Sequence, residues 1–264
     1  MITIRQFIDR INDRFPPGEE GVQTVDTVKA GDASAPVRGV VVTFTATRGV
    51  LARAIGLGAN LVITHEPTYY HHRDETGWLR GDPVYESKRA FIEESGLVLW
   101  RCHDGWHRHE PDGICEGMAH AFGWTGREIA GRPGRYEVDP VSLGELARHC
   151  KTAVGLAAAR VAGDPGMSCR RIALMPGAWG GRRQIIALSE ADIDVVVCGE
   201  SPEWETCEYV RDSAAAGRPK GLIVLGHANS EEAGMGWMVP WLRPLLPSDI
   251  AITHVPAGDP FHVI

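Results

Sequence analysis

The chain has 264 residues, enough for one large domain or for two smaller ones. Hydrophobic residues make up 44% of it and charged residues 23%, which is the composition of an ordinary soluble globular protein. The formal net charge of −7 argues against a nucleic-acid-binding protein, because such a surface requires clustered Lys and Arg.

Membrane and secreted proteins are disfavoured as well. No stretch approaches the roughly 20 apolar residues of a membrane span, and the N-terminal segment is patterned as an amphipathic helix instead of a signal peptide. The six cysteines include no C-x-x-C pair and no dense cluster, so we expect reduced thiols and a cytoplasmic protein.

The first predicted element is an amphipathic helix at the N-terminus. Apolar residues recur on one helical face from Ile4 to Phe15. Thr3 and Gln6 have the spacing of a capping box, and Pro16 is expected to stop the helix.

Short apolar runs then alternate with helical patterns along the chain. The runs predicted as strands are residues 37–44, 60–64, 97–102, 169–177, 194–199, 220–226 and 250–255. The patterns predicted as helices are residues 47–58, 84–96, 114–124, 142–156, 182–191, 204–217 and 234–247. Strand, helix and strand over residues 37–64 form a βαβ unit, which implies parallel pairing.

This alternation predicts an α/β fold of two related halves with mixed sheets. Residues 126–138 are rich in glycine and arginine and are the expected linker. The first half is then residues 1–125 and the second is residues 139–264, with the last segment able to pack back on the first half.

Titratable side chains follow four of the predicted strands. They are His65 and Glu66 after 60–64, His103, Asp104 and His107 after 97–102, Glu200 after 194–199, and His227 with Glu231 after 220–226. In open α/β sheets, ligands bind beyond the carboxyl ends of the strands. Four such strand ends together predict a functional site.

The residue types favour a metal site over other chemistries. The chain has no G-x-S-x-G nucleophile elbow, no phosphate-binding P-loop, and no G-x-G-x-x-G after its first predicted strand. Imidazole with carboxylate suits Zn, Mn, Fe or Co. His227 and Glu231 would share a face if a helix begins after Gly226, and a carboxylate there could bridge two ions about 3.5–4 Å apart.

Less specific interpretations exist for each candidate. Only one of Asp104 and His107 need reach an ion, and His103 or Glu200 could orient a ligand instead of binding the ion. His71, His72 and His109 are expected to be solvated loop residues, while Tyr69, Tyr70 and Trp106 could wall a pocket or simply pack under loops. The segment "PGAWGGRR" could hold an anion at a helix start, although a surface turn explains it better.

Three stretches, "LGANLVITHEP", "GICEGMAHAFGW" and "LGHANSEE", resemble the Nif-three-like dinuclear metal-centre family, some of whose members carry a GTP cyclohydrolase label. The resemblance covers about residues 24–124 and 194–264. It implies a two-part α/β protein with two divalent metal ions between its halves, commonly assembled as a hexameric ring. It places His65, His227 and Glu231 at ligand positions of the family.

Two positions depart from the family pattern. Glu66 stands where the family has the second histidine of a His-His pair. His107 stands where the family has the aspartate of a His-x-x-x-Asp stretch that begins here at His103. Asp104 is a candidate to supply the missing oxygen ligand from a shifted position.

The leading hypothesis is a metal-dependent hydrolase that acts on a small molecule. His65, Glu66, His227 and Glu231, with Asp104 or His107, would hold two ions. Glu200 or an unused carboxylate such as Asp104 would act as the base. The alternative is a non-catalytic, metal-stabilised ring that binds a protein partner, and a nucleotide-binding module ranks last.

Overall fold

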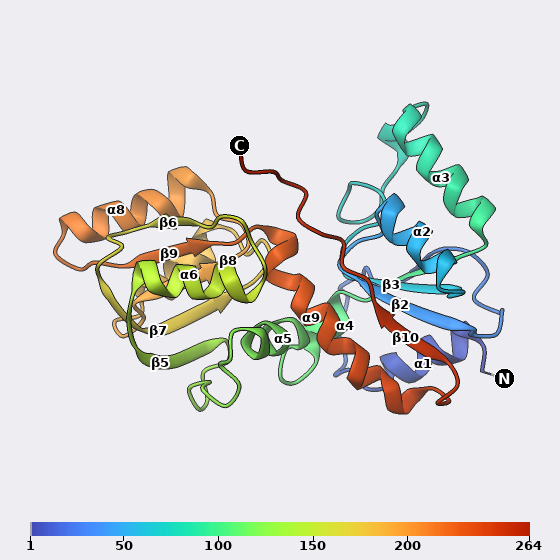
Figure 1. Ribbon diagram of the computed structural model, residues 1–264, viewed down its shortest axis with the longest axis horizontal. Helices are drawn as coiled ribbons and strands as arrows, with labels where there is room; N and C mark the ends of the chain where they lie inside the picture. The colour runs from blue at the N-terminus through green and yellow to red at the C-terminus, as the bar shows by residue number, and fades with distance from the viewer. Residues whose placement is uncertain (1) are drawn as a thin grey trace. The chain divides into compact units, whose positions relative to one another are not determined.

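The computed structural model describes residues 2–264, which divide into two compact units. The first unit comprises the chain up to Gly113 together with Met235–Ala257, and the second comprises Ile114–Gly234 with Gly258–Ile264. Each unit is built on its own five-stranded sheet (Figure 1). The protein is therefore α/β with two mixed sheets, as predicted.

The sheet of the first unit has the strand order β1-β4-β3-β2-β10. Its strands are β1 (Val28–Ala30), β2 (Gly39–Thr43), β3 (Leu61–Thr64), β4 (Val98–Arg101) and β10 (Ala251–His254). The last four are parallel, and only the edge strand β1 runs antiparallel to its neighbour. The βαβ prediction for residues 37–64 is confirmed, since β2 pairs in parallel with β3.

Helices cover both faces of this sheet (Figure 1). The helices of the first unit are α1 (Ile4–Asn12), α2 (Arg48–Gly56), α3 (Pro83–Ser95) and α4 (Asp104–Arg108), with short 3-10 turns at Gly77–Leu79 and Arg243–Leu245. Residues of α2 and α3 share one core cluster with Val41 of β2, Val62 of β3 and Leu99 of β4. The predicted capping box of α1 is present, with Thr3 and Gln6 bonded reciprocally.

The second unit has the strand order β5-β7-β8-β9-β6, with parallel β7, β8 and β9 inside two antiparallel edges. The strands are β5 (Arg135–Ser142), β6 (Arg160–Ala162), β7 (Ser168–Met175), β8 (Val195–Cys198) and β9 (Gly221–Val224). The helices are α5 (Gly113–Ala121), α6 (Leu143–Ala153), α7 (Gly181–Ser189), the π-helix Glu203–Cys207 and α8 (Glu208–Ala215). The segment 126–138, expected as a linker, lies in this unit and includes the start of β5.

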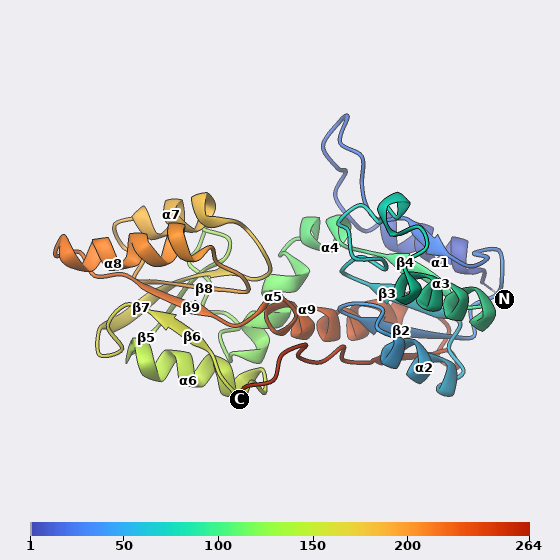
Figure 2. The same ribbon diagram turned by 90° about the horizontal axis from the view of Figure 1, so that it is seen from above.

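Three layers form the second unit (Figure 2). Ile172 and Leu174 of β7 pack in one core cluster with residues of α5 and α6. Ala173 and Met175 face the opposite way, into a cluster with residues of α7 and α8. This alternation is the period of two expected of a strand buried on both faces.

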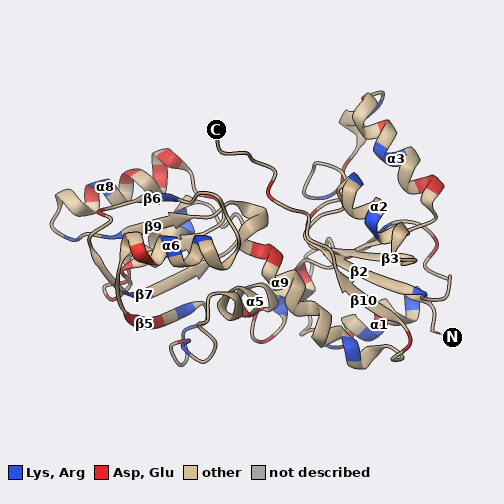
Figure 3. Ribbon diagram, viewed as in Figure 1, with Lys and Arg blue, Asp and Glu red and all other residues tan. Residues whose placement is uncertain are grey.

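The remaining helix, α9 (His227–Leu242), begins in the second unit and continues into the first. It starts earlier than the predicted residues 234–247 and keeps Pro240 inside it. None of the helices in residues 2–264 combines the length and the apolar composition needed to cross a membrane. Lys and Arg are interspersed with Asp and Glu in both units (Figure 3).

Candidate metal-binding clusters

In the first unit, three histidines meet beyond the carboxyl ends of two neighbouring parallel strands. Thr64 of β3 pairs with Arg101 of β4, so both strands end at the same edge of the sheet. His65 follows β3 directly. His103 follows β4 as the residue before α4, and the bond from the His107 amide to the His103 carbonyl places His107 one turn further on.

We call His65, His103 and His107 the histidine cluster. The ring centroids lie 4.5 Å apart for His65 and His103, and 4.9 Å apart for each of the other two pairs. One ring nitrogen from each residue lies within 4.8 Å of the other two. His65 is fully buried and the other two are partly exposed. Three converging imidazoles are a donor set that Zn²⁺, Fe²⁺ or Co²⁺ accepts.

Two carboxylates hold the Nδ1 atoms of this cluster. Asp104 Oδ1 lies 2.8 Å from His103 Nδ1, and Asp112 Oδ2 lies 2.9 Å from His107 Nδ1. A carboxylate at Nδ1 keeps the proton there and leaves Nε2 with its lone pair, which is the tautomer that binds a metal ion. The geometry therefore holds His103 and His107 in the tautomer whose Nε2 atom can bind a metal ion.

Asp104 is engaged on both of its oxygens. Its Oδ2 accepts hydrogen bonds from Thr24 Oγ1 at 2.8 Å and from the Val25 amide at 3.0 Å. Burial raises the pKa of Asp104, but the bonds from His103, Val25 and Thr24 together hold it well below its usual value. The structure thus brings His107 into the cluster and places Asp104 behind His103.

Asp26 fixes the start of α4 and was not singled out by the sequence. Its Oδ1 accepts from the amides of His103 and Asp104 at 2.7 and 2.9 Å, and its Oδ2 accepts from Gly105 at 2.6 Å. These amides are the unsatisfied donors of a helix start, so the carboxylate caps α4. The helix that carries His107 is held in place from 77 residues away in the chain.

Glu66 lies beside the histidine cluster and contacts a buried arginine. Its Oε2 is 3.2 Å from Arg101 NH2, and its Oε1 is 3.8 Å from His103 Nε2. The Arg101 side chain is fully buried, whereas 15% of the Glu66 side chain is exposed. Glu66 can therefore direct one oxygen at the cluster while the other is held by Arg101.

The second unit has its own candidate group, formed by Glu200, His227 and Glu231. Glu200 follows β8, while His227 and Glu231 lie on successive turns at the start of α9, as the spacing predicted. His227 Nδ1 is 2.8 Å from Glu200 Oε1, and His227 Nε2 is 3.4 Å from Glu231 Oε2. His227 thus repeats the arrangement of His103 and His107, with a carboxylate at Nδ1.

Two buried contacts place this group. The Gln184 side chain is fully buried and donates to the Glu200 carbonyl at 2.7 Å, which fixes the backbone that carries Glu200. Gly177 lies against the other side: its amide donates to Ser230 Oγ at 2.9 Å, and a Cβ there would overlap the Glu231 carboxylate. Gly177 also has φ +73°, so both its backbone conformation and the lack of space for a Cβ favour glycine.

The other histidines and aromatic residues have ordinary roles. His109 Nδ1 contacts the Pro111 carbonyl at 2.7 Å, and its ring packs on Trp106, which is a core residue. The His71 ring accepts from the Arg73 amide. His72 is exposed, with its ring centroid 5.6 Å from that of His103, and partial burial lowers its pKa. Tyr69 is buried and Tyr70 is exposed.

The start of α7, which carries "PGAWGGRR", already faces an acidic side chain. A Cβ on Gly181 would overlap the Glu205 carboxylate, so that carboxylate lies against the first turn of the helix. Negative charge is favourable at this end of a helix. A further anion would be repelled there, which supports the surface-turn interpretation.

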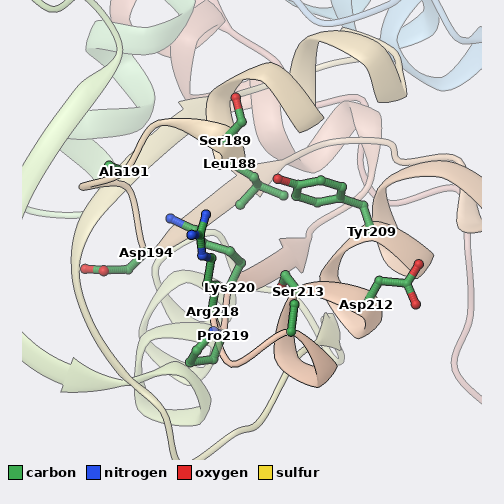
Figure 4. Close-up of a pocket in the computed structure, with 11 residues that line it drawn as sticks. Leu188, Ser189, Ala191, Asp194, Tyr209, Asp212, Ser213, Arg218, Pro219 and Lys220 are labelled. Carbon is green, nitrogen blue, oxygen red and sulfur yellow. The ribbon is translucent and has the colours of Figure 1, made fainter.

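A surface pocket of about 630 Å³ lies elsewhere in the second unit (Figure 4). Tyr209, Arg218 and Lys220 line it, together with Leu188. It opens beside Lys220, at the amino end of β9, whereas His227 follows the carboxyl end of that strand. The pocket is therefore separate from the candidate ligands.

The family model Duf34/NIF3 (NGG1p interacting factor 3) matches residues 2–257. The chain belongs to the DUF34/NIF3 family. This match confirms the family resemblance of the three sequence stretches.

Curated and structural relatives agree with the family. A Clostridium perfringens protein named GTP cyclohydrolase 1 type 2 homolog is 22% identical over 275 residues and is matched along all of both chains. A Bacillus cereus protein related to NIF3 superposes with a TM-score of 0.78 at 15% identity, covering 100% of this chain and 99% of its own. A hypothetical protein of Staphylococcus aureus gives 0.77 at 17% identity, with 99% of each chain covered. These similarities show the NIF3 fold.

Proposed function

We propose that this NIF3 protein is a metal-dependent hydrolase that uses two divalent ions to act on a small molecule. The observation that carries the proposal is the histidine cluster, because its ring nitrogens converge and two of its Nδ1 atoms are held by carboxylates. The name of the Clostridium perfringens relative, GTP cyclohydrolase 1 type 2 homolog, supports a hydrolytic reaction. The ions are of the Zn, Mn, Fe or Co class, whose donors match imidazole and carboxylate.

Each candidate residue has a role in the proposal. His65, His103 and His107 supply nitrogen ligands in the first unit, and Glu66 supplies an oxygen. His227 and Glu231 supply a nitrogen and an oxygen in the second unit. When bound, such ions lower the pKa of a water molecule and orient it for attack.

Asp104, Asp112 and Glu200 position imidazoles in this proposal, because each contacts an Nδ1 atom. Glu200 has a further role open to it, since 58% of its side chain is exposed while one oxygen holds His227. We assign it as the candidate base that accepts a proton from the attacking water. Both oxygens of Asp104 are already engaged, by His103 on one side and by Thr24 and Val25 on the other, so it is better suited to positioning alone.

The alternative, a metal-stabilised scaffold without turnover, is favoured by one observation. The histidine cluster links β3, β4 and α4 through side chains at the edge of one sheet, so an ion there would stabilise the first unit. A scaffold requires closed coordination, whereas a hydrolase requires a position open to water.

Metal analysis of protein purified without added metal tests the proposal. We expect bound transition metal in the wild type, loss of that metal in His65→Ala and Glu231→Ala, and no loss in His109→Ala, which removes a histidine outside the clusters. Full occupancy in both His65→Ala and Glu231→Ala would overturn the ligand assignment. Turnover of amide, ester or phosphoester substrates, lost with the metal, distinguishes a hydrolase from a scaffold.

A further inference from the structure

Arg101 is a buried charged side chain that the proposed ligand set does not include. It ends β4 and is fully buried, although arginine is almost never fully buried without a partner. Its guanidinium remains charged in proteins and presents five donors in a fixed plane. The contacts of the guanidinium therefore indicate the role of this buried charge.

All three contacts of the guanidinium go to the segment that follows β3. Arg101 Nε donates to the His65 carbonyl at 2.8 Å, and NH1 donates to the His72 carbonyl. NH2 lies 3.2 Å from Glu66 Oε2. One planar group thus fixes the backbone of a candidate ligand and the carboxylate of the next residue.

The two oxygens of Glu66 are made unequal by this contact. Oε2 is directed to Arg101, and Oε1 is directed to the histidine cluster, 3.8 Å from His103 Nε2. A carboxylate held in this way can offer only one oxygen to an ion. Lysine could not replace the arginine, because its single ammonium cannot span three acceptors in one plane.

We propose that Arg101 is a positioning residue that presents His65 and Glu66 to a metal ion and restricts Glu66 to one-oxygen coordination. This rests on the proposed function, since it requires an ion at the histidine cluster. It concerns the carboxylate that follows His65, where this chain departs from the family pattern, and the buried guanidinium that contacts it.

Positioning and simple charge repulsion predict opposite results, so they can be separated. If Arg101 only repelled a cation, its replacement by glutamine would strengthen metal binding and its replacement by lysine would change little. If it positions the ligands, both replacements weaken binding, by about 10- to 100-fold, as loss of a ligand's supporting partner does.

The experiment uses Co²⁺ alone as the probe, titrated into the metal-free full-length protein. Affinity comes from calorimetry, and the visible d–d spectrum reports the number and geometry of ligands. The variants are Arg101→Lys, Arg101→Gln, Glu66→Gln and the double variant Arg101→Lys/Glu66→Gln. Arg89→Lys is the matched control, because Arg89 forms an exposed ion pair with Glu86 in the same unit.

We expect both Arg101 variants to bind Co²⁺ more weakly with a changed spectrum, and Arg89→Lys to match the wild type. We also expect Arg101→Lys to cost less affinity when Glu66 is already glutamine, because the arginine then has less to position. Thermal unfolding in EDTA checks that each variant folds. If an Arg101 variant does not fold, Glu66→Gln, which keeps an oxygen for the arginine, carries the spectral comparison.

Unchanged or tighter Co²⁺ binding in the Arg101 variants overturns the inference and leaves the proposed function standing. Equal losses from Arg101→Lys in the wild-type and Glu66→Gln backgrounds also overturn it, because the arginine would then not act through Glu66 as proposed. An unchanged spectrum in Glu66→Gln removes Glu66 from the ligands and overturns the inference again. Wild-type protein that takes up no Co²⁺ overturns both proposals.

Discussion

Three histidines in this protein share one local arrangement, a carboxylate at Nδ1. The partners are Asp104 for His103, Asp112 for His107 and Glu200 for His227, at 2.8, 2.9 and 2.8 Å. A single instance is a common hydrogen bond. Repetition at three candidate ligands supports a metal site, because a histidine ligand keeps its proton on the nitrogen that faces away from the ion.

Asp112→Asn tests this arrangement at one residue. The amide is similar in shape but carries no charge, so His107 loses the partner that fixes its tautomer. We expect metal affinity to fall about 10- to 100-fold, with little change in thermal stability of the metal-free protein. Calorimetric titration measures the metal affinity, and a thermal melt measures the stability of the metal-free protein. Asp212→Asn, at an exposed aspartate, is the control, and equal affinities in the two variants would contradict the assignment.

Gly177→Ala tests the packing around Glu231. Alanine there combines an unfavourable positive φ, costing about 1–2 kcal/mol, with overlap of its Cβ and the Glu231 carboxylate. Gly155 has nearly the same φ, +71° against +73°, with nothing near its Cβ, so Gly155→Ala isolates the backbone cost. We expect urea unfolding to show a larger loss for Gly177→Ala, with loss of metal in that variant alone. Equal losses of stability in the two variants would show that the Glu231 side chain moves and relieves the overlap with the new Cβ.

We expect buried thiols to contribute to the pH dependence of stability of the second unit at alkaline pH. Burial raises the pKa of Cys150, Cys169 and Cys198 from 9.0 to about 12. The unfolded chain therefore releases these protons at lower pH than the folded protein. Their contribution to stability is complete below about pH 9 and is lost as pH rises towards about 12.

Unfolding by urea at several pH values between about 8 and about 11 measures this effect. Each such thiol contributes a slope of up to about 1.4 kcal/mol per pH unit. Cys198→Ala should lower stability at all pH values and also flatten the alkaline slope. Cys207→Ala, at a partly exposed thiol, is the control for the slope. A slope that is the same in both variants would contradict the assignment to burial.

The candidate ligands were easier to predict from the sequence than the residues that hold them in place. His65, Glu66, His107, His227 and Glu231 were predicted as candidate ligands because each comes shortly after an apolar run, which is a local pattern, whereas His103 was predicted only to orient a ligand. Asp26 could not be found in this way, since its partners lie 77 to 79 residues further on and only the pairing of β1 with β4 brings the segments together. Asp112 sits in a polar loop that offers no periodicity.

At the scale of elements, apolar runs of four or more residues and periodic helices were predicted, whereas the three-residue strands and the largely polar strand β5 were not. The capping box of α1 was predicted correctly, because Thr3 with Gln6 is a local signal, and Ser142 with Glu145 forms the same signal at the start of α6. β1 and β6 have three residues each, too few to show alternation. β5 contains Pro140 at a shift in register, which is tolerated because β5 is an edge strand.

Asp26→Asn tests the support of α4, the helix that carries His107. Loss of the charged cap should cost about 1–2 kcal/mol and should also weaken metal binding, because His103 and His107 depend on this helix. Ser142→Ala removes the cap of α6 at a similar cost but far from the candidate ligands in the chain. Urea unfolding of both variants measures the loss of stability, and Co²⁺ titration measures the loss of metal binding. Weaker metal binding in Ser142→Ala as well would indicate a general loss of fold.

At the scale of the whole molecule, the family resemblance leads us to propose a homo-hexameric ring. Light scattering after size exclusion should then give six times the chain mass of 28.7 kDa. Repeating the measurement after dialysis against EDTA shows whether the ions hold the assembly together or only the chain. A monomeric mass at micromolar concentration would contradict the hexamer.

The last strand of the first sheet comes from the far end of the chain. β10 pairs with β2, and all but a few residues of the second unit lie between them in the sequence. During synthesis on the ribosome, the first sheet therefore cannot add its edge strand β10 until the second unit has emerged. Nascent chains stalled before Ala251 should expose the β2 edge to proteases and chaperones, while the second sheet is already closed.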